Sequence, residues 1–232
     1  MRAYWDERAR LNAAYYVDTS LAYDDPDMDH FWSQGEAIVR YAVDDAPVAV
    51  PTGGTALEIG CGLGRNLRAL SARFDHVVGI DISEEMLARA REAVGAAVAL
   101  HHGDGLSLRP VADASTDLVL SFTVLQHIPD PAVIAAYVRE TGRVLRPGGF
   151  AALQWNGSRG SALGWALRRR ALALRTRLGR STDDYGREVP EFLGSRVPLR
   201  RMRTLLADAG LEIRGVANAG SLYSWVWAQR PG

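Results

Sequence analysis

The chain has 232 residues, of which 47% are hydrophobic, and its 27 basic side chains balance 27 acidic ones. That length and composition suffice for one substantial core, so we expect a single domain, and the zero formal net charge gives no reason to expect a nucleic acid as partner. The single cysteine excludes an intramolecular disulfide and a cysteine zinc cluster, and without a signal peptide or the ~18 apolar residues of a membrane span we expect a cytoplasmic protein with no membrane partner.

Residues 1–50 combine acidic and aromatic side chains. They carry ten acids against four arginines. The acidic cluster at residues 24–29 lacks the glycine turn and the distal acid of a calcium loop, so we expect a solvated loop and no metal. The aromatic side chains, which include Tyr15 and Tyr16, suggest a segment that covers a neighbouring site.

A glycine-rich turn follows the strand predicted at residues 55–60. The sequence there reads Leu57-Glu58-Ile59-Gly60-Cys61-Gly62-Leu63-Gly64-Arg65. Glycine adopts positive φ without strain and has no Cβ, so such a turn lets a small polar ligand lie against bare backbone. Arg65 stands where the dinucleotide fingerprint requires its third glycine, which disfavours NAD or FAD.

Asp81 ends the next predicted strand, residues 76–81, about twenty residues after the turn, where a carboxylate can bind both hydroxyls of a ribose. Ser83 then caps a predicted helix, and Asp130 with Pro131 begins another that should end before Arg146. Further strands are predicted at 96–102, 117–122, 150–155, 211–217 and 222–228. This alternation indicates an α/β protein, with helices on both faces of a parallel sheet.

The ordered set of motifs resembles the class I S-adenosylmethionine-dependent methyltransferases of small-molecule type. It comprises the glycine turn, Asp81, His102-Gly103-Asp104-Gly105, Asp117-Leu118-Val119-Leu120-Ser121-Phe122, Val124-Leu125-Gln126-His127-Ile128 and Arg146-Pro147-Gly148-Gly149-Phe150. The resemblance implies a Rossmann-like sheet of seven strands, with the last strand antiparallel between two earlier ones. It also implies one methyltransferase domain over 1–232: a helical lid at 1–50, a cofactor core at 51–156, a substrate-side helical insertion at 157–198 between strands five and six, and a C-terminal helix and strands at 199–232.

By the same resemblance, the cofactor is S-adenosylmethionine and its product S-adenosylhomocysteine. Glu58 would orient the methionine ammonium, Asp81 would hold the ribose, and Asp104 with Gly105 would read the adenine. The full set of expected cofactor contacts is Glu58, Gly60, Cys61, Gly62, Gly64, Asp81, Ile82, Asp104, Gly105, Ser121 and Phe122. Expected acceptor contacts are Tyr15, Tyr16, Trp155 and Asn156, although packing in the core is an equal alternative for Trp155.

His127 is the candidate catalytic residue. It follows the fourth strand, near the expected path of the methyl group, and a histidine has a suitable pKa for accepting a proton from an acceptor hydroxyl. The alternative is a histidine that only packs and forms hydrogen bonds beside the cofactor.

The insertion contains leucines and an alanine at helical spacing: Leu163, Leu167, Ala171, Leu174 and Leu178. Arginines occupy its other faces, so we expect an amphipathic helix. Packing on its own domain is the favoured interpretation, and binding to a membrane surface or an acidic partner is the alternative.

The leading hypothesis is therefore an enzyme that methylates a hydroxyl or amine of a small-molecule metabolite, for example in specialised metabolism. A first alternative keeps the fold for another reaction, such as decarboxylation or cyclisation by intramolecular displacement. A second is a non-catalytic binding module, against which Glu58, Asp81 and Asp104 argue. The sequence leaves open whether the protein is a monomer or a homodimer.

Overall fold

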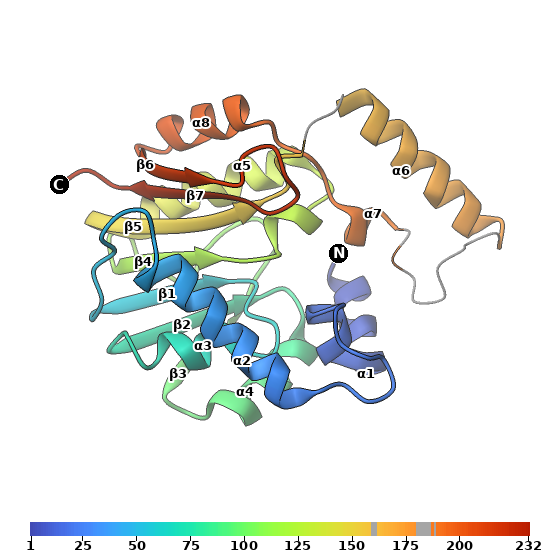
Figure 1. Cartoon of the computed structure of the whole chain (residues 1–232), viewed down its shortest axis with the longest axis horizontal. Helices are drawn as coiled ribbons and strands as arrows, with labels where there is room; N and C mark the ends of the chain where they lie inside the picture. The colour runs from blue at the N-terminus through green and yellow to red at the C-terminus, as the bar shows by residue number, and fades with distance from the viewer. Residues whose placement is uncertain (159–161, 180–186, 188) are drawn as a thin grey trace.

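A single seven-stranded mixed sheet lies at the centre of the computed structural model, which describes residues 1–158, 162–179, 187 and 189–232 (Figure 1). The strands follow the order β3-β2-β1-β4-β5-β7-β6. They are β1 Thr55–Ile59, β2 His76–Asp81, β3 Val98–His102, β4 Thr116–Ser121, β5 Leu145–Trp155, β6 Glu212–Ala217 and β7 Ser224–Gln229. The predicted α/β sheet of seven strands is confirmed.

The last strand, β7, is antiparallel to both of its neighbours, β5 and β6, whereas the other pairings are parallel. This inserted strand was expected at 222–228 and begins instead at Ser224. Strand β5 begins at Leu145, before its expected start at Phe150, because Leu145 already pairs with Thr116. The register then shifts at the Arg146–Gly149 segment before regular pairing resumes.

Helices cover both faces of the sheet, as Figure 1 shows. They are α1 Arg2–Val17, α2 Met28–Val39, the π-helix η1 Arg40–Asp44, α3 Arg65–Leu70, α4 Glu84–Val94, the 3-10 helix η2 Leu125–His127, α5 Pro131–Val144, α6 Ala162–Arg177, α7 Pro190–Leu193 and α8 Leu199–Asp208. Apolar residues of α5 and α8 pack against one face of the sheet, and those of α2, η1 and α3 pack against the other.

Helix starts follow the predicted caps. The Ser83 hydroxyl accepts a hydrogen bond from the Met86 N–H at the start of α4, and Asp130 caps α5 with Pro131 in its first turn. Both predicted starts are confirmed, because a side-chain oxygen at this position satisfies an N–H that has no partner within the helix.

Each face of the sheet contains a fully buried tryptophan that binds a distant segment. The Trp155 Nε1–H donates to the Val197 carbonyl over 2.8 Å, and the Trp227 Nε1–H donates to the Ala42 carbonyl over 2.9 Å. Trp155 belongs to the apolar cluster formed with α5 and α8, and Trp227 belongs to the cluster on the opposite face. The two indoles therefore connect the sheet to the segment before β1 and to the end of the insertion.

Helix α1 is interrupted at Asn12, whose backbone leaves helical geometry at φ −162° and ψ 88°. The Asn12 Oδ1 accepts a hydrogen bond from the Tyr15 N–H over 3.0 Å, and its Nδ2–H donates to the Tyr23 carbonyl. Asn12 therefore caps the second part of α1, and the first part lies at a different angle.

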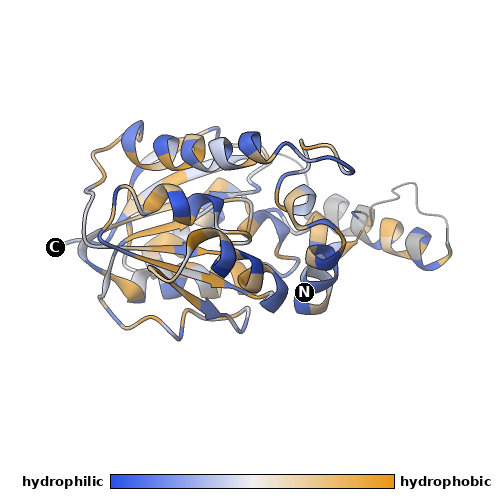
Figure 2. Ribbon diagram, turned by 90° about the horizontal axis from the view of Figure 1, so that it is seen from below, coloured by the Kyte–Doolittle hydropathy of each residue, from blue (hydrophilic) through white to orange (hydrophobic). Residues whose placement is uncertain are grey.

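Helix α6 projects away from the rest of the chain (Figures 1 and 2). Its residues Leu167 and Leu174, and Leu178 just beyond its end, keep 55–60% of their surface exposed. The expectation that this helix packs on its own domain is therefore wrong for these side chains. The side chain of Leu163 lies outside the described residues. No helix in the described part of the chain has the length and apolar character to cross a bilayer.

Candidate functional site

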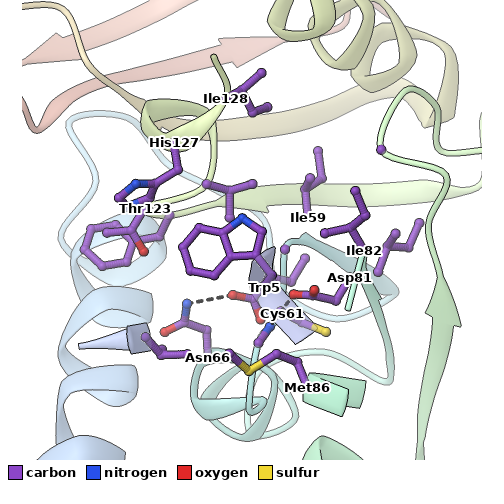
Figure 3. Close-up of a pocket in the computed structure, with 18 of the residues that line it drawn as sticks. Trp5, Ile59, Cys61, Asn66, Asp81, Ile82, Met86, Thr123, His127 and Ile128 are labelled. Atoms are coloured by element: carbon purple, nitrogen blue, oxygen red, sulfur yellow. Dashed lines mark hydrogen bonds between the residues drawn. The ribbon is translucent and has the colours of Figure 1, made fainter. Parts of the chain in front are cut away.

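A cavity lies at the carboxyl ends of β1, β2 and β4, where parallel strands commonly bind ligands (Figure 3). It encloses about 970 Å³ including its open mouth. Its walls come from the glycine turn, the ends of these strands, Met1 and helix α1, which contributes Trp5. Trp5 lies across the cavity in Figure 3, facing the turn.

The glycine turn needs glycine at two positions that line the cavity. Gly60 and Gly62 have φ of +70° and +52°, in the left-handed region. A Cβ on Gly60 would lie 2.2 Å from a methyl of Val124, and one on Gly62 would lie 3.2 Å from a methyl of Val17. The turn is therefore a close-fitting cradle with its backbone open to a ligand. Gly64, at φ +84°, precedes α3 and does not line the cavity.

Asp81 connects the turn to helix α4. The Gly62 N–H donates to one carboxylate oxygen over 2.8 Å, and the Ser83 N–H donates to the other over 2.9 Å. Burial raises the pKa of Asp81, against the lowering effect of these hydrogen bonds. Each carboxylate oxygen can accept a further hydrogen bond, so Asp81 is able to hold hydroxyl groups of a ligand in the cavity.

Glu58 is buried in the wall of the same cavity with one oxygen unpaired. The Asn66 side chain donates to Oε1 over 2.7 Å, whereas Oε2 has no hydrogen-bond partner among the described residues. Burial raises the pKa of Glu58 to about 8. An unpaired buried acid is unfavourable by itself, and a cationic group of a ligand would satisfy it.

The predicted adenine contacts are only partly brought to the cavity. Gly105 lines it, as does Ile82 from the general set of cofactor contacts. Asp104 is exposed, and its carboxylate accepts hydrogen bonds from the Leu106 N–H, the Ser107 N–H and the Ser107 hydroxyl at 2.7–2.8 Å. These bonds turn the carboxylate into its own loop, so the arrangement does not support the expected contact of Asp104 with adenine.

The remaining expected cofactor residues divide in the same way. Cys61 and Phe122 line the cavity, whereas Ser121 is fully buried in β4 and does not reach it. Ser121 is the last residue of β4 and Phe122 follows the strand, and the contacts expected of both are through backbone groups, so the directions of their side chains do not test them.

A second cavity of about 1200 Å³, again including open space, adjoins the first. The two cavities share a wall made of Tyr16, Val17, Arg65, Phe122, Thr123 and His127. Beyond that wall the second cavity is lined by one acid, two hydroxyl side chains, neutral amides, aliphatic chains and aromatic rings: Asp18, Thr19, Ser20, Gln34, Ile38, Gln126, Asn156, Phe192, Leu193, Leu222 and Tyr223. Phe192 and Leu193 belong to α7, so the insertion forms part of this cavity.

Arg65 in the shared wall forms an ion pair with Asp18, an acid of the second cavity. The Arg65 Nη1 lies 2.7 Å from Asp18 Oδ2, and both side chains are largely buried. Burial acts to raise the pKa of Asp18, but hydrogen bonds from Ser20 and Arg65 outweigh it and the pKa is lowered. The Arg65 guanidinium also lies over the ring of Phe31. The second cavity, which both side chains line, therefore contains a paired cation and anion.

A directed chain of hydrogen bonds leads to His127. The Thr123 N–H donates to Gln154 Oε1 over 2.8 Å, which fixes the orientation of that amide. Gln154 Nε2 donates to Gln126 Oε1 over 3.0 Å and to the Leu222 carbonyl over 2.8 Å. Gln126 Nε2 is thereby directed at His127 Nε2, at 3.1 Å.

This chain determines the protonation of His127. Because the Gln126 amide donates, His127 Nε2 must accept, and Nδ1 carries the hydrogen that is donated to the Phe192 carbonyl. Burial lowers the pKa of His127 to about 4, so the ring is neutral. Its ring also packs against Trp5 and Phe192, with centroids 5.6 and 4.9 Å apart. Both ring nitrogens already form hydrogen bonds. This favours the alternative of a histidine that only packs and forms hydrogen bonds beside the cofactor over the predicted role as a base.

Two of the expected acceptor contacts lie elsewhere. Trp155 is fully buried in the core and lines neither cavity, so its packing alternative is the one that the structure supports. Tyr15 is buried against Tyr16 and Tyr23 and also lines neither cavity. Tyr16 and Asn156 do line the second cavity. Trp5 belongs to the aromatic segment that was expected to cover the site, whereas Gln126 and Phe192 were not predicted as site residues, and only the position of Gln126 beside His127 could have indicated one of these two.

Comparisons with known proteins agree with this site. Residues 57–153 match the family model described as a methyltransferase domain. The chain is 37% identical over 159 residues to the 2-methyl-6-phytyl-1,4-hydroquinone methyltransferase of Synechocystis, covering 66% of this chain and 46% of that protein. It is 38% identical over 107 residues to the 27-O-demethylrifamycin SV methyltransferase of Amycolatopsis mediterranei, covering 44% and 38%. The chain thus spans less than half the length of these relatives.

The fold is also shared with a putative methyltransferase of Haloferax volcanii solved with its Trm112 activator. That structure aligns with a TM-score of 0.63 at 18% identity, covering 98% of this chain and 99% of the other. A doubly wound sheet with a glycine turn and a strand-end acid defines a nucleotide-binding class. Within that class, residues 57–153 belong to the methyltransferase domain family, and the relatives identify the S-adenosylmethionine-dependent type, which implies S-adenosylmethionine as cofactor.

Proposed function

We propose that the protein transfers the methyl group of S-adenosylmethionine to an aromatic or amphiphilic small molecule held in the second cavity. The observation that carries this proposal is the shared wall between the two cavities. A donor in the first cavity and an acceptor in the second would meet at Phe122, Thr123 and His127. The relatives named for a hydroquinone and for a rifamycin support an acceptor of this chemistry.

The first cavity fits the cofactor in its donor groups. Glu58, with its unpaired buried oxygen, would face the methionine ammonium, and Asp81 would accept hydrogen bonds from the ribose. The backbone at Gly60–Gly62 would lie against the methionine portion, and Ile82 and Gly105 would flank the base. The bound sulfonium supplies an activated methyl group whose leaving group needs no protonation.

The chain itself contributes alignment and exclusion of water, which are the main requirements of an in-line displacement. Trp5 and Met1 would cover the cofactor, and the His127 hydrogen bond to the Phe192 carbonyl would fix the wall of the acceptor cavity. With His127 occupied at both nitrogens, the acceptor must arrive as a good nucleophile. An ionised phenol or a neutral amine meets that requirement.

Binding of the cofactor can be tested with Asp81→Ala. Loss of two charge-assisted hydrogen bonds to the ribose, each worth roughly 1.5–3 kcal/mol, should weaken S-adenosylhomocysteine binding at least tenfold in calorimetry. Asp25→Ala, which removes an exposed carboxylate outside the cavity, should leave the affinity unchanged. Unchanged affinity in Asp81→Ala would contradict the assignment.

Methyl transfer can be tested by incubating the protein with methyl-labelled S-adenosylmethionine and a library of phenols and aromatic amines, with detection by mass spectrometry. Asn156→Ala should reduce labelling and leave cofactor affinity intact, because Asn156 lines only the second cavity. Cofactor binding with no labelled product from any acceptor would favour a non-catalytic module or a repurposed reaction.

A further inference from the structure

Helix α6 presents an apolar stripe that no described residue of the chain covers. Leu167, Leu174 and Leu178 have exposed fractions of 55%, 58% and 60%, and Ala171 between them is also exposed. Their spacings of four, three and four residues place them along one side of a helix. Figure 2 shows this helix extending from the body of the molecule.

The charge of α6 is of one sign. Within Ala162–Arg177 there are five arginines and no acidic residue. Of these, Arg170, Arg175 and Arg177 are exposed. At 3.6 residues per turn, Arg175 lies on one side of the leucine stripe, and Arg170 and Arg177 lie on the other. The stripe is therefore flanked by cations on both sides.

We propose that α6 binds an anionic lipid surface, with its leucine stripe at the boundary between headgroups and acyl chains. A helix with a narrow apolar stripe flanked by arginines suits a membrane surface, where the acyl chains below the helix are apolar and the phosphates beside it are anionic. The guanidinium groups extend outward from their apolar stems to lipid phosphates, while the leucines leave water. A second copy of the chain would instead need to offer an apolar groove bounded by acids. The two large cavities of the described residues already form the candidate site.

The position of α6 also relates this surface to the acceptor cavity. The helix contacts α7, which contributes Phe192 and Leu193 to that cavity. A lipid-bound α6 would therefore place the cavity near the membrane surface, where apolar acceptors dissolve. This consequence rests on the proposed function, whereas lipid binding itself does not.

Sedimentation with vesicles tests the proposal directly. The full-length protein should bind vesicles of phosphatidylcholine with phosphatidylglycerol at least tenfold more strongly than vesicles of phosphatidylcholine alone. Raising the salt concentration should weaken this binding, because the arginine contribution is screened. The double variant Leu167→Glu with Leu174→Glu, and separately Arg170→Gln with Arg175→Gln, should each reduce binding to the anionic vesicles at least tenfold.

Leu11→Glu is the matched control, since Leu11 is also a helical leucine with 55% of its surface exposed. It should bind vesicles like the unmodified protein, and circular dichroism should show every variant folded. Equal vesicle binding by the α6 variants and the control, or no binding to anionic vesicles, would overturn the proposal. A dimer in size-exclusion chromatography that the Leu167/Leu174 variant dissociates would assign the stripe to a second copy of the chain instead.

Discussion

Glu58 holds a proton at neutral pH in the free protein, because burial raises its pKa to about 8. An ammonium group beside its unpaired Oε2 favours the carboxylate and lowers that pKa, so binding should release a proton at any pH between the lowered pKa of the complex and about 8. Affinity for S-adenosylhomocysteine should therefore rise about tenfold per pH unit between pH 5.5 and 7. Calorimetry in buffers with different ionisation enthalpies measures the released proton.

The matched variant is Glu58→Gln, which keeps the shape and cannot release a proton. It should bind more weakly at pH 7 and lose the pH dependence. An unmodified protein whose affinity stays constant from pH 5.5 to 7 would show that no ammonium approaches Glu58.

His127 gives a second prediction at the scale of one residue. An enzymatic base contributes about 10²–10⁴ in turnover, but the His127 Nε2 already accepts a hydrogen bond from Gln126. We therefore expect His127→Asn to lower turnover less than tenfold, to raise the KM for the acceptor, and to leave the pH profile unchanged in shape. A drop above a hundredfold together with a flattened acid limb would restore the role as base.

Residue positions were predictable where the backbone alone decides them. The glycine turn and Asp81 follow from strand ends, and carboxyl ends of parallel strands share one edge of the sheet. The adenine contact of Asp104 stays a prediction: Asp104 does not line the cavity, and local N–H groups compete for its carboxylate. The chain from Gln154 to His127 joins two segments 28 residues apart and leaves no pattern in the sequence.

At the scale of elements, helix α1 is attached to the start of α4 by polar contacts. The Ser83 hydroxyl donates to Asp6 over 2.7 Å, and Arg10 donates two hydrogen bonds to Glu85 at 2.9 and 2.7 Å. Asp6→Ala should free the first part of α1, so limited proteolysis within residues 1–12 should quicken several-fold. Cofactor affinity should fall about threefold to tenfold, since Trp5 then covers the cavity less of the time.

Glu7→Ala is the control for this variant, because the exposed Glu7 carboxylate pairs with the adjacent Arg8. It should change neither cleavage nor affinity. If cofactor with acceptor fails to slow cleavage of the unmodified protein, the predicted lid is a fixed part of the fold.

Element boundaries were predicted well where capping residues mark them, as at Ser83 and Asp130. The placement of α6 was not predicted, because periodicity identifies an apolar face and does not identify what covers it. The start of β5 was placed five residues late, since Leu145 pairs with Thr116 across a register shift that the sequence does not mark.

For the whole molecule, Trp155 and Trp227 join peripheral segments to opposite faces of the sheet. Replacing either by Phe removes a buried hydrogen bond and leaves a carbonyl unpaired, so each variant should lose about 1–3 kcal/mol of unfolding free energy in urea. Hydrogen exchange should separate the two. Trp227→Phe should expose amides near Ala42, and Trp155→Phe should expose those near Val197.

Each tryptophan variant serves as the control for the other. Faster exchange in both segments for either variant would show that the two faces open together, and the indoles would then have no separate local effect.

The interruption at Asn12 allows the stability of the fold and the rate of ligand release from the first cavity to vary independently. The second part of α1 contributes Ala13 and Ala14 to a buried cluster, whereas the first part contributes only Ala9 to it and is otherwise joined to α4 by a few polar contacts. The first part can therefore pivot at residue 12 with the loss of Ala9 alone from the cluster. Product release would then be limited by breaking those contacts, on the microsecond to millisecond scale typical of such motions, and a mutation there would alter turnover without altering the melting temperature.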